Sequence, residues 1–160
     1  YRLPAEQVCA VIHRQSLVHS RLEVRDGAVQ AQLGTPDMHL PIRYAFTWPN
    51  RADNPAEPLD LLQCPPLTFA APDADSFPCL RLAVEAAREG GTACAVLNGA
   101  NEAAVGLFLR EEIGFNDISR LVAQARERVG VCQSPTLEDI LEADRQARAS
   151  VMGNHEGVIS

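Results

Sequence analysis

Alternating apolar and polar residues predict a β-hairpin over residues 18–33. On the first strand, one face carries Val18, Leu22 and Val24, and the other carries His19, Arg21 and Glu23. Asp26-Gly27 supplies the turn, because glycine accepts the positive φ of a tight hairpin, and the alternation resumes over residues 29–33. The predicted hairpin therefore has one apolar face and one polar face.

Short segments around the hairpin extend this prediction to a small antiparallel sheet. Residues 8–12 form an apolar run typical of a short buried strand, and residues 67–69 are a candidate for another. Residues 34–38 have no regular period, and the nearby prolines favour an exposed loop of defined shape. The apolar and aromatic residues 43–48 favour one or two helical turns behind Pro41.

A proline-rich segment follows. Seven of the eleven prolines lie between residues 49 and 78, where they exclude regular helix and central strand. Apolar residues such as Leu61 and Phe69 interrupt the prolines and need packing partners. We therefore predict a linker with an extended path rather than a flexible one.

From residue 76 onward the apolar positions recur with the helical period, which predicts four amphipathic helices in a small bundle. The expected end signals are Ser76 and Gly90-Gly91 for the first helix, Gly114 after the second, Asn116 or Asp117 before the third, and a Thr136–Asp139 capping box before the fourth. The expected apolar stripes are Leu80, Val84 and Ala87; Ala93, Val96, Leu97, Ala104, Leu107 and Phe108; Ile118, Leu121, Val122, Ala125 and Val129; and Leu137, Ile140, Leu141 and Ala147. Gly99 is expected to break or kink the second helix, and residues 153–160 are expected to fray.

Composition removes several classes of function. The 160 residues carry a net charge of −7, and no lysine is present, so neither a lysine Schiff base nor a Walker-type phosphate loop is encoded here. No arginine cluster predicts nucleic-acid binding. No apolar run is long enough for a membrane span and no signal peptide is visible, so we expect a cytoplasmic protein. The five cysteines are widely spaced, which argues against zinc or a disulfide framework.

The most distinctive chemistry lies on the hairpin and in the loop after it. His13 and His19 precede the loop that presents Met38, and this combination predicts part of a site. A metal site formed by the two histidines is not expected, because a separation of six residues suits neither a helix nor a strand. For His19 the alternative is a polar cross-strand partner, and for Met38 an adaptable core filler.

Taken in order, these segments resemble the C-terminal part of the 1-deoxy-D-xylulose 5-phosphate reductoisomerase family. The resemblance is carried by residues 11–20, Asp26-Gly27, residues 31–34, Pro36-Asp37-Met38, Pro41-Ile42, Trp48-Pro49, residues 67–69, 71–73 and 77–80, Leu97-Asn98 and residues 100–102. The family usually has Pro at Arg14 and Arg-Thr at His39-Leu40, so this chain departs from the pattern beside its candidate site.

The resemblance implies an NADPH-dependent homodimeric enzyme that uses Mg²⁺ or Mn²⁺ and converts the phosphorylated sugar 1-deoxy-D-xylulose 5-phosphate to 2-C-methyl-D-erythritol 4-phosphate. It implies that His19, Pro36 and Met38 line the substrate and cofactor side of the active site. The family's catalytic, metal-binding and NADPH-binding motifs would precede Tyr1, so we expect no catalytic residue, no metal ligand and no activity in this chain alone. A plastid origin is an alternative to a bacterial one.

The implied fold class is α+β: a small antiparallel sheet at the end of the catalytic domain, a proline-rich linker and a C-terminal four-helix bundle. The expected boundaries are 1–48 for the strands and loop, 49–75 for the linker, 76–152 for the bundle and 153–160 for a disordered tail. Asn98, Asn101 and Glu102 are expected to be structural, with Glu102 in contact with the sheet. The alternative function is a stand-alone, non-catalytic dimerisation or binding module.

Overall fold

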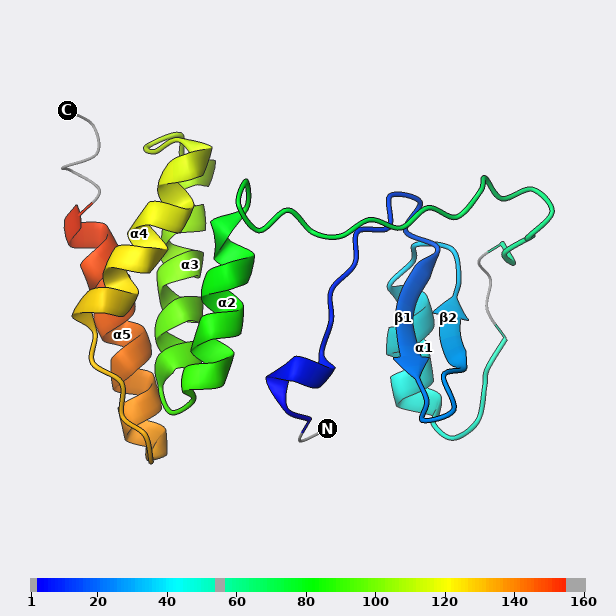
Figure 1. Ribbon diagram of the computed structural model, residues 1–160, viewed down its shortest axis with the longest axis horizontal. Helices are drawn as coiled ribbons and strands as arrows, with labels where there is room; N and C mark the ends of the chain where they lie inside the picture. Colours follow the sequence, from blue (N-terminus) through cyan, green and yellow to red (C-terminus); the bar gives the residue numbers. More distant parts are fainter. Residues whose placement is uncertain (1–2, 54–56, 155–160) are drawn as a thin grey trace. The chain divides into compact units, whose positions relative to one another are not determined.

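The computed structural model describes residues 3–53 and 57–154 (Figure 1). It divides into two compact units. Residues 10–72 form the first, called here the sheet unit, and residues 1–9 join residues 73–160 in the second, called here the helical unit. The expected domain boundaries remain a proposal.

The sheet unit contains the hairpin that the alternating pattern predicts. Strand β1 (Val18–Glu23) pairs with strand β2 (Val29–Leu33) in an antiparallel, two-stranded sheet. Gly27 has a φ of +84°, and the backbone N–H of Ala28 donates to the Asp26 carboxylate at 3.0 Å. The turn therefore uses the backbone freedom of glycine, as predicted, and also the side chain of aspartate.

The strict alternation predicted for β1 is wrong, because a β-bulge interrupts it at His19. Val18 pairs with Leu33 and Ser20 pairs with Gln32, so β1 advances two residues while β2 advances one. A bulge shifts every later side chain of its strand to the opposite face. The apolar side of the hairpin is consequently lined by Val11, Val18, Arg21, Val29, Ala31, Leu33, Leu67 and Phe69.

The other two strands expected in the sheet are absent from the described residues. One isolated bridge joins Ile12 and Ala70 through hydrogen bonds of 2.9 and 3.0 Å, and no ladder extends from it. Val8, expected to be buried, is 67% exposed. A single bridge fixes one pair of residues without burying a strand face, so residues 8–12 and 67–69 stay irregular.

Helix α1 (His39–Thr47) begins four residues before the segment predicted to be helical, with Pro41 in its first turn. From α1 to residue 77, the described residues contain turns and the bridge residue Ala70 but no further helix or strand. This is consistent with the high proline content of the segment.

The helical unit contains the predicted four-helix bundle. Its helices are α2 (Pro78–Glu89), α3 (Ala93–Leu109), α4 (Phe115–Arg128) and α5 (Leu137–Asn154). Helix α3 packs against each of the other three, and a 3-10 turn, η1 (Ala5–Gln7), lies beside α2. Gly153 and Asn154 belong to α5 rather than to a frayed tail, and the remainder of that expected tail lies outside the described residues.

The buried core confirms most of the stripes predicted for α3 and α4 and corrects those for α2 and α5. Its members are Val96, Ala100, Ala104, Leu107, Ile113, Ile118, Leu121, Val122, Ala125, Val129, Ala143, Ala147 and Val151. On α2, Ala86 is buried while Val84 and Ala87 face outward. On α5, the predicted Ala147 is buried, but Leu137 and Leu141 are 64% and 61% exposed, so the buried stripe begins at Ala143.

Small residues bring α3 and α5 close together, which explains the correction on α5. A Cβ at Gly99 would lie 2.6 Å from Asp144 Oδ1 and 2.9 Å from the Asp144 backbone oxygen. Gly99 therefore provides room for the neighbouring helix, and α3 continues through it without the predicted break. A stripe of alanines on α5 fits this narrow spacing better than the larger leucines do.

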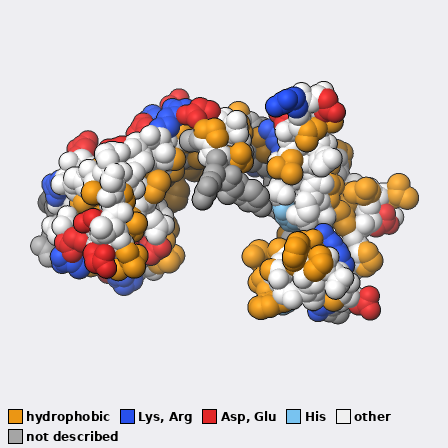
Figure 2. All heavy atoms as spheres, turned by 90° about the horizontal axis from the view of Figure 1, so that it is seen from below, with side chains coloured by type: hydrophobic (Ala, Val, Ile, Leu, Met, Phe, Trp, Pro, Cys, Tyr) orange, Lys and Arg blue, Asp and Glu red, His pale blue; other side chains and the backbone are white. Residues whose placement is uncertain are grey.

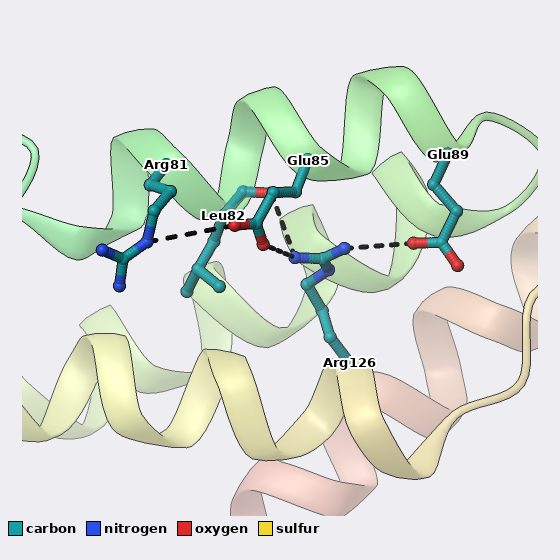
Figure 3. Close-up of polar contacts among 5 residues, drawn as sticks. All are labelled: Arg81, Leu82, Glu85, Glu89 and Arg126. Carbon is teal, nitrogen blue, oxygen red and sulfur yellow. Dashed lines mark hydrogen bonds and ion pairs between the residues drawn. The ribbon is translucent and has the colours of Figure 1, made fainter.

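Arg126 joins α4 to α2 (Figure 3). Its guanidinium donates to the Leu82 backbone oxygen at 3.2 Å and to the carboxylates of Glu85 and Glu89 at 3.1 and 3.0 Å. The Arg126 side chain is only 15% exposed, whereas both carboxylates are more open to solvent. We call this group of contacts the Arg126 clamp.

Two helix starts differ from the predicted caps. Helix α2 begins with Pro78 behind Phe77, and Ser76 instead donates its backbone N–H to Asp73 at 3.0 Å. Helix α4 begins one residue after Gly114, and the Asp117 carboxylate accepts the Gly114 N–H at 2.8 Å. The hydrogen bonds from Arg120 and Gly114 lower the pKa of Asp117 below its ordinary value.

The capping box of α5 is confirmed and supports a prediction of stability. The Thr136 hydroxyl accepts the Asp139 N–H at 3.2 Å, and the Asp139 carboxylate accepts the Thr136 N–H at 2.9 Å. Thr136→Ala should lower the free energy of unfolding by about 0.5–2 kcal/mol in urea denaturation, because the first turn loses its cap. Ser134→Ala, two residues earlier, is the control and should leave the midpoint unchanged.

Hydrogen bonds from Thr136 also lower the pKa of Asp139. A carboxylate whose pKa is lower in the folded state stabilises that state above its ordinary pKa, and this contribution disappears as the pH falls through the lowered value. The effect of Thr136→Ala should therefore shrink in strong acid. An effect of equal size at neutral and acidic pH would contradict this assignment of the cap.

Candidate functional site

The three residues expected to line a site lie around one hollow in the sheet unit. His19, Pro36 and Met38 border a surface hollow with a volume of about 460 Å³. The remaining lining residues are Ser16, Ser20, Gln32, Asp37, Leu40 and Pro41. The hollow therefore combines a polar wall on the hairpin with a largely apolar wall formed by the loop and the start of α1.

The bulge on β1 determines how the hairpin contributes to this hollow. Because His19 is the extra residue of β1, both His19 and Ser20 border the hollow, where strict alternation would place only one of them. Beneath them, buried Gly34 donates its N–H to the Leu17 backbone oxygen at 3.0 Å. A Cβ at Gly34 would lie 3.8 Å from His19 Nε2, an ordinary van der Waals distance, so Gly34 lies close to the histidine ring.

Local hydrogen bonds fix the loop that carries Met38. The Asp37 N–H donates to the Thr35 backbone oxygen at 2.7 Å. Asp37 Oδ1 accepts the backbone N–H of His39 at 2.9 Å and lies 2.6 Å from His39 Nδ1. These contacts with His39 lower the pKa of the Asp37 carboxyl, the backbone hydrogen bond most of all. Between the two bonded residues, Met38 is 70% exposed.

His13 lies at a different place and has a different role from His19. Its Nδ1 is 2.9 Å from the Thr68 backbone oxygen, and its ring stacks on Phe69 with centroids 4.7 Å apart. Gln15 donates to the Pro66 backbone oxygen at 3.0 Å and to the Thr68 hydroxyl at 2.9 Å. These contacts attach the residues before β1 to the proline-rich segment, a role that the sequence pattern did not reveal.

The polar residues of α3 bond within the bundle. Asn98 donates to Glu102 at 3.0 Å, and Arg148 on α5 donates to Glu102 and Asp144 at 2.7 and 2.8 Å. Glu102 therefore contacts α5, and its expected contact with the sheet remains a prediction. The hydrogen bonds from Arg148 and Asn98 lower the pKa of Glu102. Asn101 borders a second hollow, of about 230 Å³, together with Cys79 and the aromatic residues Phe77 and Phe115.

Three observations limit what the described residues can do. They contain no group of three or more His, Cys, Asp or Glu side chains that could hold a metal ion. All five cysteines carry free thiols, and burial raises the pKa of the Cys79 thiol. In residues 3–53 and 57–154, no helix is both long and apolar enough to cross a membrane.

Comparison with curated proteins gives consistent relatives. The chain is 53% identical over 148 residues to the 1-deoxy-D-xylulose 5-phosphate reductoisomerase of a Synechococcus species, an alignment that covers 92% of this chain and 38% of the relative. It is 47% identical over 151 residues to the enzyme of the same name from Acetivibrio thermocellus, covering 94% of this chain and 40% of that protein. The chain thus spans about two fifths of the length of these relatives.

Solved structures show the same fold. The reductoisomerase from Zymomonas mobilis in complex with NADPH superimposes with a TM-score of 0.90 at 39% identity, over 97% of this chain and 41% of that one. A reductoisomerase in complex with NADPH, fosmidomycin and magnesium gives a TM-score of 0.85 at 42% identity, over 91% of this chain and 38% of that one. The α+β fold class is confirmed.

A family-specific match covers most of the chain. Residues 33–150, from the end of β2 almost to the end of α5, match the family described as the DXP reductoisomerase C-terminal domain. Together with the relatives above, this match shows that the chain belongs to the 1-deoxy-D-xylulose 5-phosphate reductoisomerase family, of which it comprises the C-terminal region.

Proposed function

We propose that this chain is the C-terminal part of an enzyme that converts 1-deoxy-D-xylulose 5-phosphate to 2-C-methyl-D-erythritol 4-phosphate with NADPH and Mg²⁺ or Mn²⁺. The observation that carries the proposal is the 53% identity to a reductoisomerase over 92% of this chain. Solved relatives in complex with NADPH, fosmidomycin and magnesium support the choice of cofactors.

Within such an enzyme, the hollow beside His19 and Met38 forms the wall on the substrate and cofactor side. Its polar side offers an imidazole, the Ser20 hydroxyl and the Gln32 amide, which suit the hydroxyl groups of a sugar phosphate. Its apolar side offers Pro36 and Met38, which suit the flat face of a nicotinamide ring. NADPH supplies hydride when bound, and these residues orient the reactants and exclude water.

The described residues do not fit a metal site. A Mg²⁺ or Mn²⁺ ion requires several oxygen ligands, and no cluster of three candidate side chains occurs in residues 3–53 and 57–154. No step of the reaction is therefore assigned to a metal ligand of this chain. The metal would be held by the region of the relatives that this chain does not match.

We also propose that the chain alone is inactive and that the active form is a homodimer. Apolar side chains on the sheet unit support a larger assembly, because Val29 is 54% exposed and Phe69 is 54% exposed beside the hairpin. Figure 2 shows hydrophobic side chains spread over the surface of this unit, on the right of the view. Large exposed apolar patches mark surfaces that another polypeptide covers.

A graft tests the proposed function. This chain replaces the matched C-terminal region of the Synechococcus relative, and oxidation of NADPH is measured with 1-deoxy-D-xylulose 5-phosphate and Mg²⁺. We expect the graft to turn over substrate and the chain alone to show no turnover, because the hollow then meets the remainder of the active site. The parent relative is the positive control.

The alternative, a non-catalytic dimerisation or binding module, predicts a different outcome. A graft with the circular dichroism and oligomeric state of the parent, but without turnover, would contradict the proposed function. Tight binding of NADPH by the chain alone, measured by fluorescence titration, would contradict the assignment of the cofactor site to the remainder of the enzyme.

A further inference from the structure

We propose that Asp37 and His39 are positioning residues that hold Met38 against the hollow, an inference that rests on the proposed function. The two side chains form a clasp across Met38. Neither residue is expected to react with substrate, and their role is to fix the loop that forms the apolar wall.

The clasp is built from two hydrogen bonds to one oxygen atom. Asp37 Oδ1 accepts the His39 backbone N–H at 2.9 Å and contacts the His39 ring nitrogen Nδ1 at 2.6 Å. Met38 is the residue between Asp37 and His39. Each of the two hydrogen bonds therefore closes a short ring of atoms that includes the Met38 backbone. A change of backbone conformation that moved Met38 away from the hollow would break the backbone hydrogen bond.

The surroundings of the clasp leave Met38 dependent on it. Met38 is 70% exposed, and no residue of α1 is fully buried, so packing holds this side chain only weakly. On the N-terminal side, the Asp37 N–H donates to Thr35 at 2.7 Å, and on the C-terminal side the Ile42 N–H donates to Met38 at 3.3 Å. Local hydrogen bonds, rather than a core, therefore determine where the apolar wall lies.

The backbone hydrogen bond is expected to matter more than the contact with the His39 ring. The His39 side chain is 85% exposed, and exposed side-chain contacts contribute little because water competes with them. The Asp37 side chain is 29% exposed and accepts a donor that every residue at position 39 except proline would supply. Loss of the Asp37 carboxyl group should therefore have a larger effect than loss of the His39 ring.

The test uses the active graft and compares Asp37→Ala, Asp37→Asn and His39→Ala. We expect kcat/KM for the sugar phosphate to fall about tenfold for Asp37→Ala and about threefold for His39→Ala, and to change less than about twofold for Asp37→Asn. Asparagine retains an oxygen that accepts both hydrogen bonds, so Asp37→Asn should keep the activity if residue 37 acts by positioning the loop. It would not rescue a role that requires the negative charge.

Asp60→Ala is the matched control. Asp60 Oδ1 accepts the Leu62 backbone N–H at 2.9 Å, the same two-residue arrangement, but Asp60 is not among the residues that border the hollow. Asp60→Ala should leave kcat/KM unchanged. Equal losses in Asp60→Ala and Asp37→Ala would overturn the proposal, as would an Asp37→Asn variant as impaired as Asp37→Ala.

Amide exchange measures the clasp independently of activity. In hydrogen–deuterium exchange of the graft, a peptide spanning residues 36–42 should exchange about tenfold faster in Asp37→Ala and unchanged in Asp37→Asn. Unchanged exchange in Asp37→Ala would overturn the clasp. If the graft without any substitution is folded but inactive, the proposed function is contradicted instead. Failure of the clasp and failure of the proposed function are therefore distinguishable.

Discussion

Gly91→Ala is expected to destabilise the helical unit by about 4 kcal/mol. Gly91 has a φ of +54°, a conformation that alanine adopts only with strain. A Cβ at this position would also overlap the Cys132 carbonyl oxygen and lie 2.9 Å from the Cys132 carbonyl carbon. Those are backbone atoms, which cannot rotate away.

The Cys132 carbonyl cannot move away from an added Cβ at position 91 without loss of other hydrogen bonds. The Thr92 N–H donates to the Cys132 oxygen at 3.0 Å, and the Cys132 N–H donates to the Thr92 hydroxyl at 3.0 Å. Moving residue 132 away from an alanine would break this reciprocal pair, and Thr92 is only 1% exposed. The pair joins the turn between α2 and α3 to the segment between α4 and α5.

Substitutions at two other glycines, Gly90 and Gly130, separate the effect of backbone strain from that of steric overlap. Gly90 has a φ of +74° and a ψ of −155°, a combination that is essentially confined to glycine, and its Cβ position is open, so Gly90→Ala should show the strain alone, about 2 kcal/mol. Gly130 has open space and no positive φ, so Gly130→Ala should be neutral or slightly stabilising. Urea unfolding of the chain, followed by far-UV circular dichroism, gives all three values. Equal effects at 90 and 91 would contradict the overlap.

The end of the first bundle helix shows how far the sequence can predict such features. Two consecutive glycines after an amphipathic stretch predict a left-handed helix end; both residues have positive φ, but a ψ of −155° places Gly90 outside the left-handed helical region. The contact of Gly91 with Cys132 was not predictable, because 41 residues separate them and no local pattern encodes the pairing. The positive φ of the two glycines is therefore predictable here, and the tertiary contact of Gly91 is not.

The apolar stripes of the bundle helices also show that a local pattern can be predicted more reliably than a tertiary contact. In α4 one clear apolar stripe faces the core, and its prediction is confirmed. In α5 the predicted Ala147 is buried, but the larger side chains predicted beside it are exposed. The narrow spacing at Gly99 favours the alanines Ala143 and Ala147 on the buried face of α5, leaving Leu141 61% exposed.

The sequence predicted which residues lie together at the candidate site, but not the backbone features that bring them together. His19, Pro36 and Met38 do border one hollow. Their role in the reaction remains a proposal. The β-bulge that places His19 beside Ser20 depends on pairing with β2, and regular alternation gave no sign of it. The Asp37–His39 clasp could have been suspected, because aspartate often accepts the backbone N–H two residues later.

Arg126→Met should destabilise the helical unit by about 2 kcal/mol, because the Arg126 clamp is the main polar link between α2 and α4 (Figure 3). Methionine keeps much of the aliphatic stem, so the loss reports the guanidinium. Without it, Glu85 and Glu89 repel each other one turn apart on α2, and the Leu82 carbonyl loses its side-chain donor.

The matched control is Arg145→Met. Arg145 also donates to a carboxylate, that of Glu142 at 2.6 Å, but its side chain is 72% exposed and both partners lie on α5. We expect a change within about 0.5 kcal/mol, because an exposed pair within one helix contributes little. The difference between the two variants should persist in about 1 M NaCl. Salt screens the exposed Arg145–Glu142 pair more strongly than the shielded contacts of Arg126. Equal effects would show that the clamp contributes no more than a surface ion pair, and that apolar packing alone holds α2 on α4.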